Sequence, residues 1–269
     1  MDALASLTRA LRADIIRMIA AAGSGHPGGS LSVIDILAVL YAKHLRHDPK
    51  KPEWPERDRL ILSKGHACPA LYAVLAHRGF FPMERLATLR QLGSPLQGHP
   101  ERHRLPGVEA STGSLGQGLS MGLGMALAAK LDGSSRRVYV VTGDGEMQEG
   151  QVWEALLAAP QFRLDNLTLI VDSNNGQIDG HVSEIMPLEP LAEKLRSFHW
   201  DTRRVDGHDL EALDQAFTAV KAVRDRPQAI VAKTIKGKGV SFMEDQIAWH
   251  GKAPNKDEAE KALKEILGG

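Results

Sequence analysis

Hydrophobic positions along the chain follow two patterns, one typical of helices and one typical of buried strands. Apolar residues spaced three or four apart predict helices, and short runs of Val, Ile and Leu predict strands. The helices are expected at 4–22, 31–43, 66–78, 83–91, 115–131, 150–163, 188–198 and 209–225, with a last one from about 256. The strands are expected at Arg59–Leu62, Arg137–Thr142, Leu167–Asp172, Trp200–Val205 and Ala229–Thr234.

Helical patterns separate the last four expected strands, as they do in parallel βαβ units. We therefore expect an α/β fold with a mostly parallel sheet. A chain of 269 residues can bury the core of one large domain, or of two. Between Gly93 and Gly113 both patterns stop and the chain is rich in Pro and Gly. Long loops in compact domains are usually functional or disordered, so this loop is a candidate for part of a site.

The composition excludes several classes of protein. Lys+Arg and Asp+Glu both number 33, which argues against nucleic acid or an anionic membrane as the main partner. Cys68 is the one cysteine, which excludes an internal disulfide and a zinc site built on cysteines. No segment reaches the roughly 20 uninterrupted apolar residues of a membrane span. The first 23 residues lack the layout of a signal peptide, so a cytoplasmic location is expected.

Two polar residues, Asp144 and Asn174, come directly after two of the expected strands. In open α/β sheets ligands lie beyond the carboxyl ends of the strands, and one right-handed crossover would bring both residues to that edge. A purely structural role is the alternative, because turns are commonly built from Gly, Asp and Asn. A carboxylate and an amide oxygen suit Mg²⁺, which fills its octahedron with phosphates and water. We expect Asp144 and Asn174 to be magnesium ligands beneath a diphosphate.

Gly145 and the helix that follows it favour phosphate binding. Gly145 lets the backbone approach a diphosphate closely, and a helix start near Glu149–Gly150 turns amide donors toward it. The segment GSGHPG at 23–28 has the spacing of a dinucleotide fingerprint, but a helix precedes it and Pro27 lies inside it. The KGKG segment at 236–239 lacks the spacing of a phosphate loop. Neither glycine pattern therefore predicts a nucleotide site.

Residues 143–180, from Gly-Asp-Gly through Asn-Asn to Ile-Asp-Gly, resemble the thiamine-diphosphate signature of the transketolase family. Five further segments resemble transketolase segments in the same order: SGHPGGSLS at 24–32, LSKGHACPALY at 62–72, QGHPE at 97–101, ASTGSLGQGLSMGLGMA at 110–126 and WHG at 249–251. The resemblance covers Ser24 to Gly251. It implies one diphosphate-binding domain over 1–269, a mostly parallel sheet flanked by helices.

The resemblance assigns roles to four of the eleven histidines. His66 would contact the cofactor diphosphate, and His26 and His250 would bridge the cofactor and the sugar hydroxyls. His99 would line the channel for the donor sugar. The remaining seven are expected to be ordinary surface or core residues: His44, His47, His77, His103, His181, His199 and His208.

The resemblance also implies contacts from backbone atoms and carboxylates. The turn Gly113, Ser114 and Leu115 would hold the aminopyrimidine, although many members of the family have proline at the position of Ser114. The carbonyl of Gly176 would complete the magnesium ligands, where relatives often have a larger residue. Two further residues, Gly145 and Glu146, would contact the cofactor. Glu149 and Glu154 would belong to a carboxylate network at a subunit interface, and the alternative is that they are ordinary surface residues.

The activity that the resemblance implies is transfer of a two-carbon ketol unit from a ketose phosphate to an aldose phosphate. It uses thiamine diphosphate and Mg²⁺, with Ca²⁺ or Mn²⁺ as substitutes. The reaction also needs a pyrimidine-binding domain, and only 19 residues follow His250 (269 − 250). We therefore expect the N-terminal subunit of a split transketolase with a separate C-terminal subunit. Self-association through residues 116–129 would give a heterotetramer with two copies of each chain.

Other interpretations remain open at this point. The chain could be the magnesium-binding subunit of a 2-oxo acid dehydrogenase or decarboxylase, or of a sugar-phosphate synthase. The histidines His26, His99 and His250 argue against an oxo acid, which has no array of hydroxyl groups to meet. An inactive cofactor-binding module is a further alternative, against which the intact Asp144 and Asn174 argue. The sequence does not identify the sugar.

Overall fold

The structure, a computed structural model, describes residues 1–268, and these form a five-stranded sheet with the order β1-β2-β3-β5-β4. All neighbouring strands are parallel. Their bounds are β1 Arg59–Leu62, β2 Val138–Gly143, β3 Leu167–Ser173, β4 Asp201–Asp206 and β5 Gln228–Lys233. The predicted α/β fold with a parallel sheet is confirmed, and each strand begins and ends within one residue of its predicted position.

The helices also follow the predicted periodicity, although several of their bounds differ from the predicted ones. Their bounds are α1 Asp2–Ala22, α2 Pro27–Val39, α3 Cys68–His77, α4 Gln117–Leu131, α5 Gly150–Gln161, α6 Val182–Ile185, α7 Leu191–Ser197, α8 Leu210–Val220 and α9 Lys256–Leu267. Helix α2 begins four residues earlier than predicted, because Pro27 fits the first turn of a helix. The expected helix at 83–91 is a 3₁₀ segment, Met83–Thr88, followed by the left-handed Arg90. The short α6 was not predicted.

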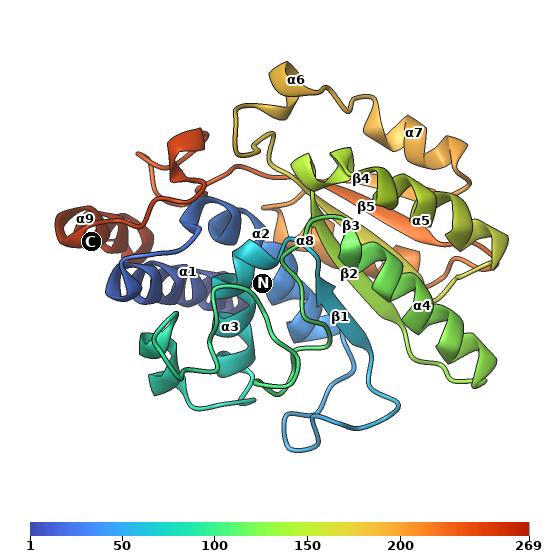
Figure 1. The fold of residues 1–269 in the computed structure, drawn as a ribbon, viewed down its shortest axis with the longest axis horizontal. Coiled ribbons are helices and arrows are strands. Elements are labelled where there is room, and N and C mark those ends of the chain that lie inside the picture. Colours follow the sequence, from blue (N-terminus) through green and yellow to red (C-terminus); the bar gives the residue numbers. More distant parts are fainter. Residues whose placement is uncertain (269) are drawn as a thin grey trace.

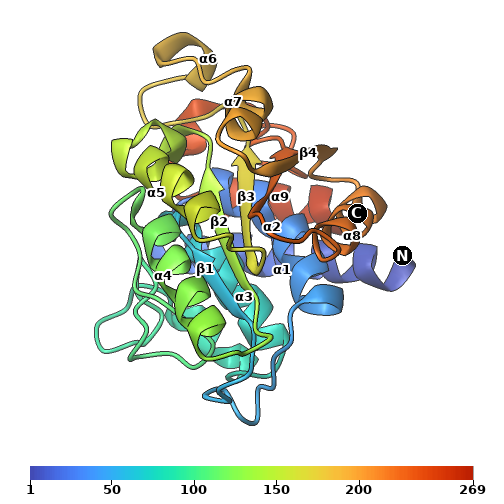
Figure 2. The same cartoon turned by 90° about the vertical axis from the view of Figure 1, so that its right-hand side faces the viewer.

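Helices cover both faces of the sheet (Figures 1 and 2). Side chains alternate along each strand, so Val138 and Val140 of β2 face a core formed with α4, α5 and α7. Tyr139 and Val141 face the other core, to which α1, α2, α3, α8 and α9 contribute. Burial on both faces explains why the strands are nearly continuous apolar runs. No helix within residues 1–268 is long and apolar enough to span a membrane.

Two glycines let α4 lie directly against the sheet. A Cβ atom at Gly122 would lie 2.3 Å from Cγ2 of Val140, and one at Gly118 would lie 2.4 Å from the Ser63 hydroxyl. The amide of Gly118 instead donates a hydrogen bond to that hydroxyl at 3.1 Å. Because α4 approaches so closely, the turn at 113–116 before it lies beside the ends of β1 and β2.

Candidate active site

The carboxyl ends of four strands meet at one cavity of about 350 Å³. Lys64 and His66 follow β1, Asp144 follows β2, Asn174 follows β3, and Lys236 follows β5. Twelve residues predicted from the sequence line this cavity: His26, His66, His99, Gly113, Leu115, Asp144, Gly145, Glu146, Glu149, Asn174, Gly176 and His250. The structure therefore brings together residues that lie more than 200 positions apart in the sequence.

Two of the predicted site residues lie outside the lining of the cavity. Ser114 is exposed beside the lining residues Gly113 and Leu115. Glu154 is exposed on α5, whereas Glu149 at the start of that helix lines the cavity. The predicted contact of Ser114 with the cofactor would thus be made by its backbone atoms. The predicted role of Glu154 would require a subunit interface.

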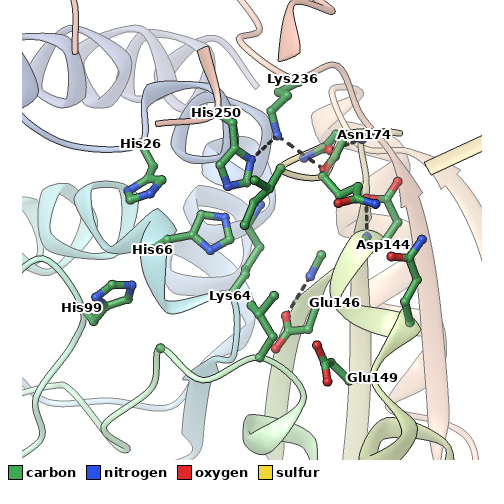
Figure 3. A pocket seen from close by; sticks show the side chains of 18 residues that line it. His26, Lys64, His66, His99, Asp144, Glu146, Glu149, Asn174, Lys236 and His250 are labelled. Atoms are coloured by element: carbon green, nitrogen blue, oxygen red, sulfur yellow. Dashed lines mark hydrogen bonds between the residues drawn. The ribbon is translucent and has the colours of Figure 1, made fainter. Parts of the chain in front are cut away.

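Four histidines form one side of the cavity (Figure 3). The ring centroid of His26 lies 5.2 Å from that of His66, 5.6 Å from that of His250 and 6.4 Å from that of His99. They come from four different segments: the start of α2, the turn after β1, the long loop and the segment after β5. The four positions carried over from the resemblance therefore meet in one place.

Burial and neighbouring cations keep these imidazoles neutral. Burial lowers the pKa of His26 to about 4, with smaller contributions from Arg90, His99 and Lys236. Burial, with Lys236, His26 and Lys64, lowers the pKa of His250 to about 3. The pKa of His66 also lies well below its ordinary value, chiefly because of burial. Neutral rings can both donate and accept hydrogen bonds, as sugar hydroxyls require.

Asp144 and Asn174 lie together on the other side of the cavity. The Asp144 carboxylate accepts hydrogen bonds from the amides of Gly145 (2.9 Å) and Asn175 (2.6 Å). The Asn174 side chain accepts one from the Gly176 amide (3.0 Å) and donates one to the Ser32 hydroxyl (3.0 Å). These bonds fix the two side chains that were predicted to bind a cation.

The electrostatics of Asp144 fit a cation. Asp144 is 4% exposed, and the nearby Lys64 pairs with Asp172 rather than with Asp144. Burial and the charge of Asp172 consequently raise the pKa of Asp144 to about 6. Within residues 1–268 no three His, Cys, Asp or Glu side chains are grouped to hold a metal. One carboxylate, one amide and one carbonyl oxygen suit Mg²⁺, which takes its other ligands from phosphate and water.

Two buried lysines were not predicted from the sequence. The Lys64 ammonium donates hydrogen bonds to Asp172 (2.5 Å) and to the Gly29 carbonyl (3.1 Å). The Lys236 ammonium lies 3.4 Å from the Gly176 carbonyl oxygen and 3.1 Å from Nδ1 of His250. Burial and the charge of Lys64 lower the pKa of Lys236 to about 8. Two buried ammonium groups beside a cavity suit a ligand of high negative charge.

The position of these lysines was visible in part in the sequence. Lys64 and Lys236 each precede a glycine shortly after a strand, at the edge where ligands bind. The KGKG segment that contains Lys236 lacks the spacing of a phosphate loop, so this pattern did not indicate the lysine. A Cβ atom at Gly176 would lie 2.8 Å from Cδ of Lys236, so the glycine provides space for this lysine.

Glu146, predicted as a cofactor contact, holds three segments together. Its carboxylate accepts hydrogen bonds from the Ser63 hydroxyl (2.5 Å) and from the amides of Gly116 (2.9 Å) and Gly143 (3.1 Å). Burial raises its pKa, although these donors act in the opposite direction. Glu146 therefore fixes the ends of β1 and β2 against the start of α4.

Residues 2–269 match the family described as transketolase, thiamine diphosphate binding domain, and the chain belongs to this family. Among its relatives, the 6-deoxy-6-sulfo-D-fructose transketolase subunit of Clostridium sp. is 49% identical over 85% of this chain and 83% of that protein. A subunit of the apulose-4-phosphate transketolase of Actinobacillus succinogenes is 41% identical over 98% of this chain and 96% of that protein. The family predicted from the sequence motifs is confirmed.

Solved transketolases share the fold. The crystal structure of transketolase from Campylobacter jejuni superimposes with a TM-score of 0.94 at 36% identity and covers 99% of this chain and 43% of that one. Transketolase of Mus musculus is 43% identical, and the match covers 42% of its length. The chain thus spans about two fifths of these longer transketolases and most of the length of the subunits. The prediction of a transketolase-type domain that binds thiamine diphosphate is confirmed.

Proposed function

We propose that this chain binds thiamine diphosphate through Mg²⁺ and works as the N-terminal subunit of a transketolase. The observation that supports it is one cavity in which Asp144 and Asn174 face two buried lysines and four neutral histidines. Asp144, Asn174 and the Gly176 carbonyl would hold the cation, with Ca²⁺ or Mn²⁺ as substitutes. Lys64, Lys236 and His66 would hold the diphosphate.

When bound, thiamine diphosphate supplies the carbanion that attacks a ketose carbonyl and the electron sink for cleavage of the C–C bond. The chain orients the group: Gly145 allows the backbone to approach the diphosphate, and the turn 113–115 holds the other end of the cofactor. His26 and His250 contact the sugar hydroxyls and accept or return their protons, since their rings are neutral at pH 7. His99 lines the path of the donor sugar.

We propose that a separate C-terminal subunit completes the site. Relatives of similar length carry names of transketolase subunits, one of them named for 6-deoxy-6-sulfo-D-fructose and another for apulose-4-phosphate. These two relatives are named for different sugars although each is similar to this chain over most of its length, so the partner would contribute much of the sugar specificity. The substrates here would be a ketose phosphate and an aldose phosphate, or sugars related to them.

We further propose that two copies of this chain pair through α4 and form a heterotetramer in the cytoplasm. Met121 and Gly124 are exposed on α4, and Leu157 and Phe162 are exposed on or next to α5. Small residues at 116–129 allow another backbone to approach closely, and an uncovered apolar surface favours association. Glu149 and Glu154, both exposed, would join a carboxylate network at that interface.

The decisive experiment combines the chain with its C-terminal partner, thiamine diphosphate and Mg²⁺. Ketol transfer from a ketose phosphate to an aldose phosphate is expected, and a chelator that removes Mg²⁺ should abolish it. Decarboxylation of a 2-oxo acid without ketol transfer would favour the oxo acid class instead. Failure of the chain to bind thiamine diphosphate after reconstitution with Mg²⁺ would favour an inactive module.

A further inference from the structure

A network of charged side chains outside the lining of the cavity is centred on Asp35 of α2. Its carboxylate accepts two hydrogen bonds from the guanidinium of Arg12 on α1, at 2.9 and 2.5 Å. It also accepts one from Nδ1 of His208, at 2.8 Å. Asp35 is 3% exposed and Arg12 is 8% exposed. The network joins α1 and α2 to the turn between β4 and α8.

The same network holds the segment that follows β5. Nε2 of His208 accepts a hydrogen bond from the Ile235 amide at 2.8 Å. Nε of Arg12 donates to the Lys238 carbonyl at 3.2 Å. These two contacts lie on either side of Lys236, whose ammonium reaches into the cavity toward His250.

We propose that His208, together with Asp35 and Arg12, is a positioning residue that sets the location of Lys236 and His250 in the cavity. None of the three lines the cavity itself. They act through the backbone of residues 235–238. The expected effect of these residues on cofactor affinity rests on the function proposed above. Their effect on the position of residues 235–238 does not.

The hydrogen bonds determine the protonation state that His208 needs. The Ile235 amide donates to Nε2, so this nitrogen carries a lone pair and the proton lies on Nδ1, which donates to Asp35. Burial acts to raise the pKa of Asp35, but the bonds from His208 and Arg12 outweigh it and keep the pKa below its ordinary value. The carboxylate is therefore charged and fixes the ring with its acceptor toward Ile235.

A second pair of histidine and aspartate provides a matched control. Nε2 of His44 lies 2.7 Å from Oδ1 of Asp214 on α8, and His44 is 8% exposed. Neither residue lines the cavity or bonds to the segment after β5. A variant that lacks His44 therefore shows how much the loss of a purely structural pair changes the segment after β5 and the affinity for the cofactor.

The experiment compares His208→Asn, His208→Gln and His44→Asn in the full chain. Asparagine can still donate to Asp35 but is too short to accept from Ile235, whereas glutamine can reach Ile235. Amide hydrogen exchange at residues 235–250, without cofactor, should become about tenfold faster in His208→Asn and return toward the wild-type rate in His208→Gln. Calorimetry with Mg²⁺ should show about tenfold weaker binding of thiamine diphosphate to His208→Asn, as for other supporting residues of metal sites.

His44→Asn should lower the midpoint of thermal unfolding without changing either measurement. Unchanged exchange at 235–250 in His208→Asn would overturn the proposal, as would equal effects of His208→Asn and His44→Asn. Faster exchange in a chain that binds no thiamine diphosphate would support the positioning of the segment and contradict the proposed function. If His208→Asn does not fold, Arg12→Lys decides in its place, because it removes the guanidinium Nε that donates to the Lys238 carbonyl. Faster exchange at 235–250 in Arg12→Lys supports the positioning, and an unchanged rate overturns it.

Discussion

Asp144 combines a buried carboxylate, two backbone donors and no paired lysine, so its charge is stabilised incompletely in the chain alone. The histidines show the opposite case, since neighbouring cations and burial keep them uncharged. At the scale of single residues, the cavity therefore disfavours the negative charge of Asp144 and the positive charges of the histidines. Each effect corresponds to a proposed role. The carboxylate would bind a cation, and the neutral imidazoles would exchange protons with sugar hydroxyls.

Replacing Asp144 by Asn should weaken Mg²⁺-dependent binding of thiamine diphosphate at least tenfold, because the charge that attracts the cation is lost. The amide oxygen can still accept from Asn175, so the fold should persist. Calorimetry and circular dichroism measure the two properties. Asp179→Asn, an exposed change in the same region, serves as the control and should bind normally. Unchanged affinity in Asp144→Asn would contradict the assignment as a ligand.

His26→Ala and His250→Ala should each lower turnover of the enzyme assembled with its partner by about 10²-fold, the usual size of a lost acid–base contribution. His103→Ala and His199→Ala should change turnover little, since neither side chain lines the cavity. Steady-state kinetics of the four variants with one sugar pair is the measurement. Similar losses in all four would show that the roles belong to other residues.

The lowered pKa of His26 predicts how stability depends on pH. An unfolded histidine binds a proton below about pH 6.5, but folded His26 binds one only below about 4. Between these values the unfolded state holds more protons, so the free energy of unfolding falls as pH falls. His26→Gln should reduce this slope near pH 5 by up to roughly one proton. Urea unfolding at several pH values tests it; an unchanged slope would mean that His26 is not held neutral.

At the scale of elements, α4 shows how two similar glycines differ in their surroundings. Gly122 is buried against Val140 of β2, while a Cβ atom at Gly124 would meet no atom within 4 Å. The first glycine sets the distance between helix and sheet, and thereby the position of the turn at 113–116. The second has no contact within the chain and lies on the surface proposed for pairing.

Gly122→Ala should therefore destabilise the chain by about 1–3 kcal/mol, the usual cost of overpacking. Gly124→Ala should leave the free energy of unfolding unchanged or raise it by up to about 1 kcal/mol, because alanine favours the helix. Urea unfolding at low protein concentration separates folding from association. If Gly122→Ala is as stable as Gly124→Ala, α4 does not depend on this close approach.

The strands and most helices could be predicted from the sequence because burial on both faces leaves long apolar runs, as in Val138–Val141. The site could be predicted where residues follow strand ends directly, as Asp144 and Asn174 do. Lys64 and Lys236 were missed because lysine usually indicates a solvated surface, and only the folded chain buries it. His208 was missed because its partners Asp35 and Ile235 lie 173 and 27 positions away in the sequence.

At the scale of the whole molecule, the cavity opens at the carboxyl edge of the sheet, where Ile178 lines it and is 68% exposed. The exposed Ile185 and Met186 lie close by in sequence. Exposed apolar residues at and near a cavity are typical of a surface that another chain covers. The proposed partner would supply that cover and the other half of the pocket.

The purified chain should dimerise, bind thiamine diphosphate weakly and transfer no ketol group. Addition of the C-terminal partner should restore tight binding and turnover, because each pocket would then be complete. Light scattering and the ketol-transfer assay measure assembly and activity, and Met121→Asp on α4 should impair pairing. Full activity of the isolated chain would refute the need for a partner.

The strand order has a consequence for synthesis on the ribosome. Strand β5 lies between β3 and β4 but leaves the ribosome after both. Until residue 233 has been made, β3 therefore presents an unpaired edge, and Asp172 lacks its hydrogen-bond partner Thr234. Unpaired edges invite pairing with other chains, and late insertion of a central strand slows folding. In the nascent chain β3, which ends directly before Asn174, and β4 therefore both present unpaired edges until β5 has been made, and aggregation is expected at these edges.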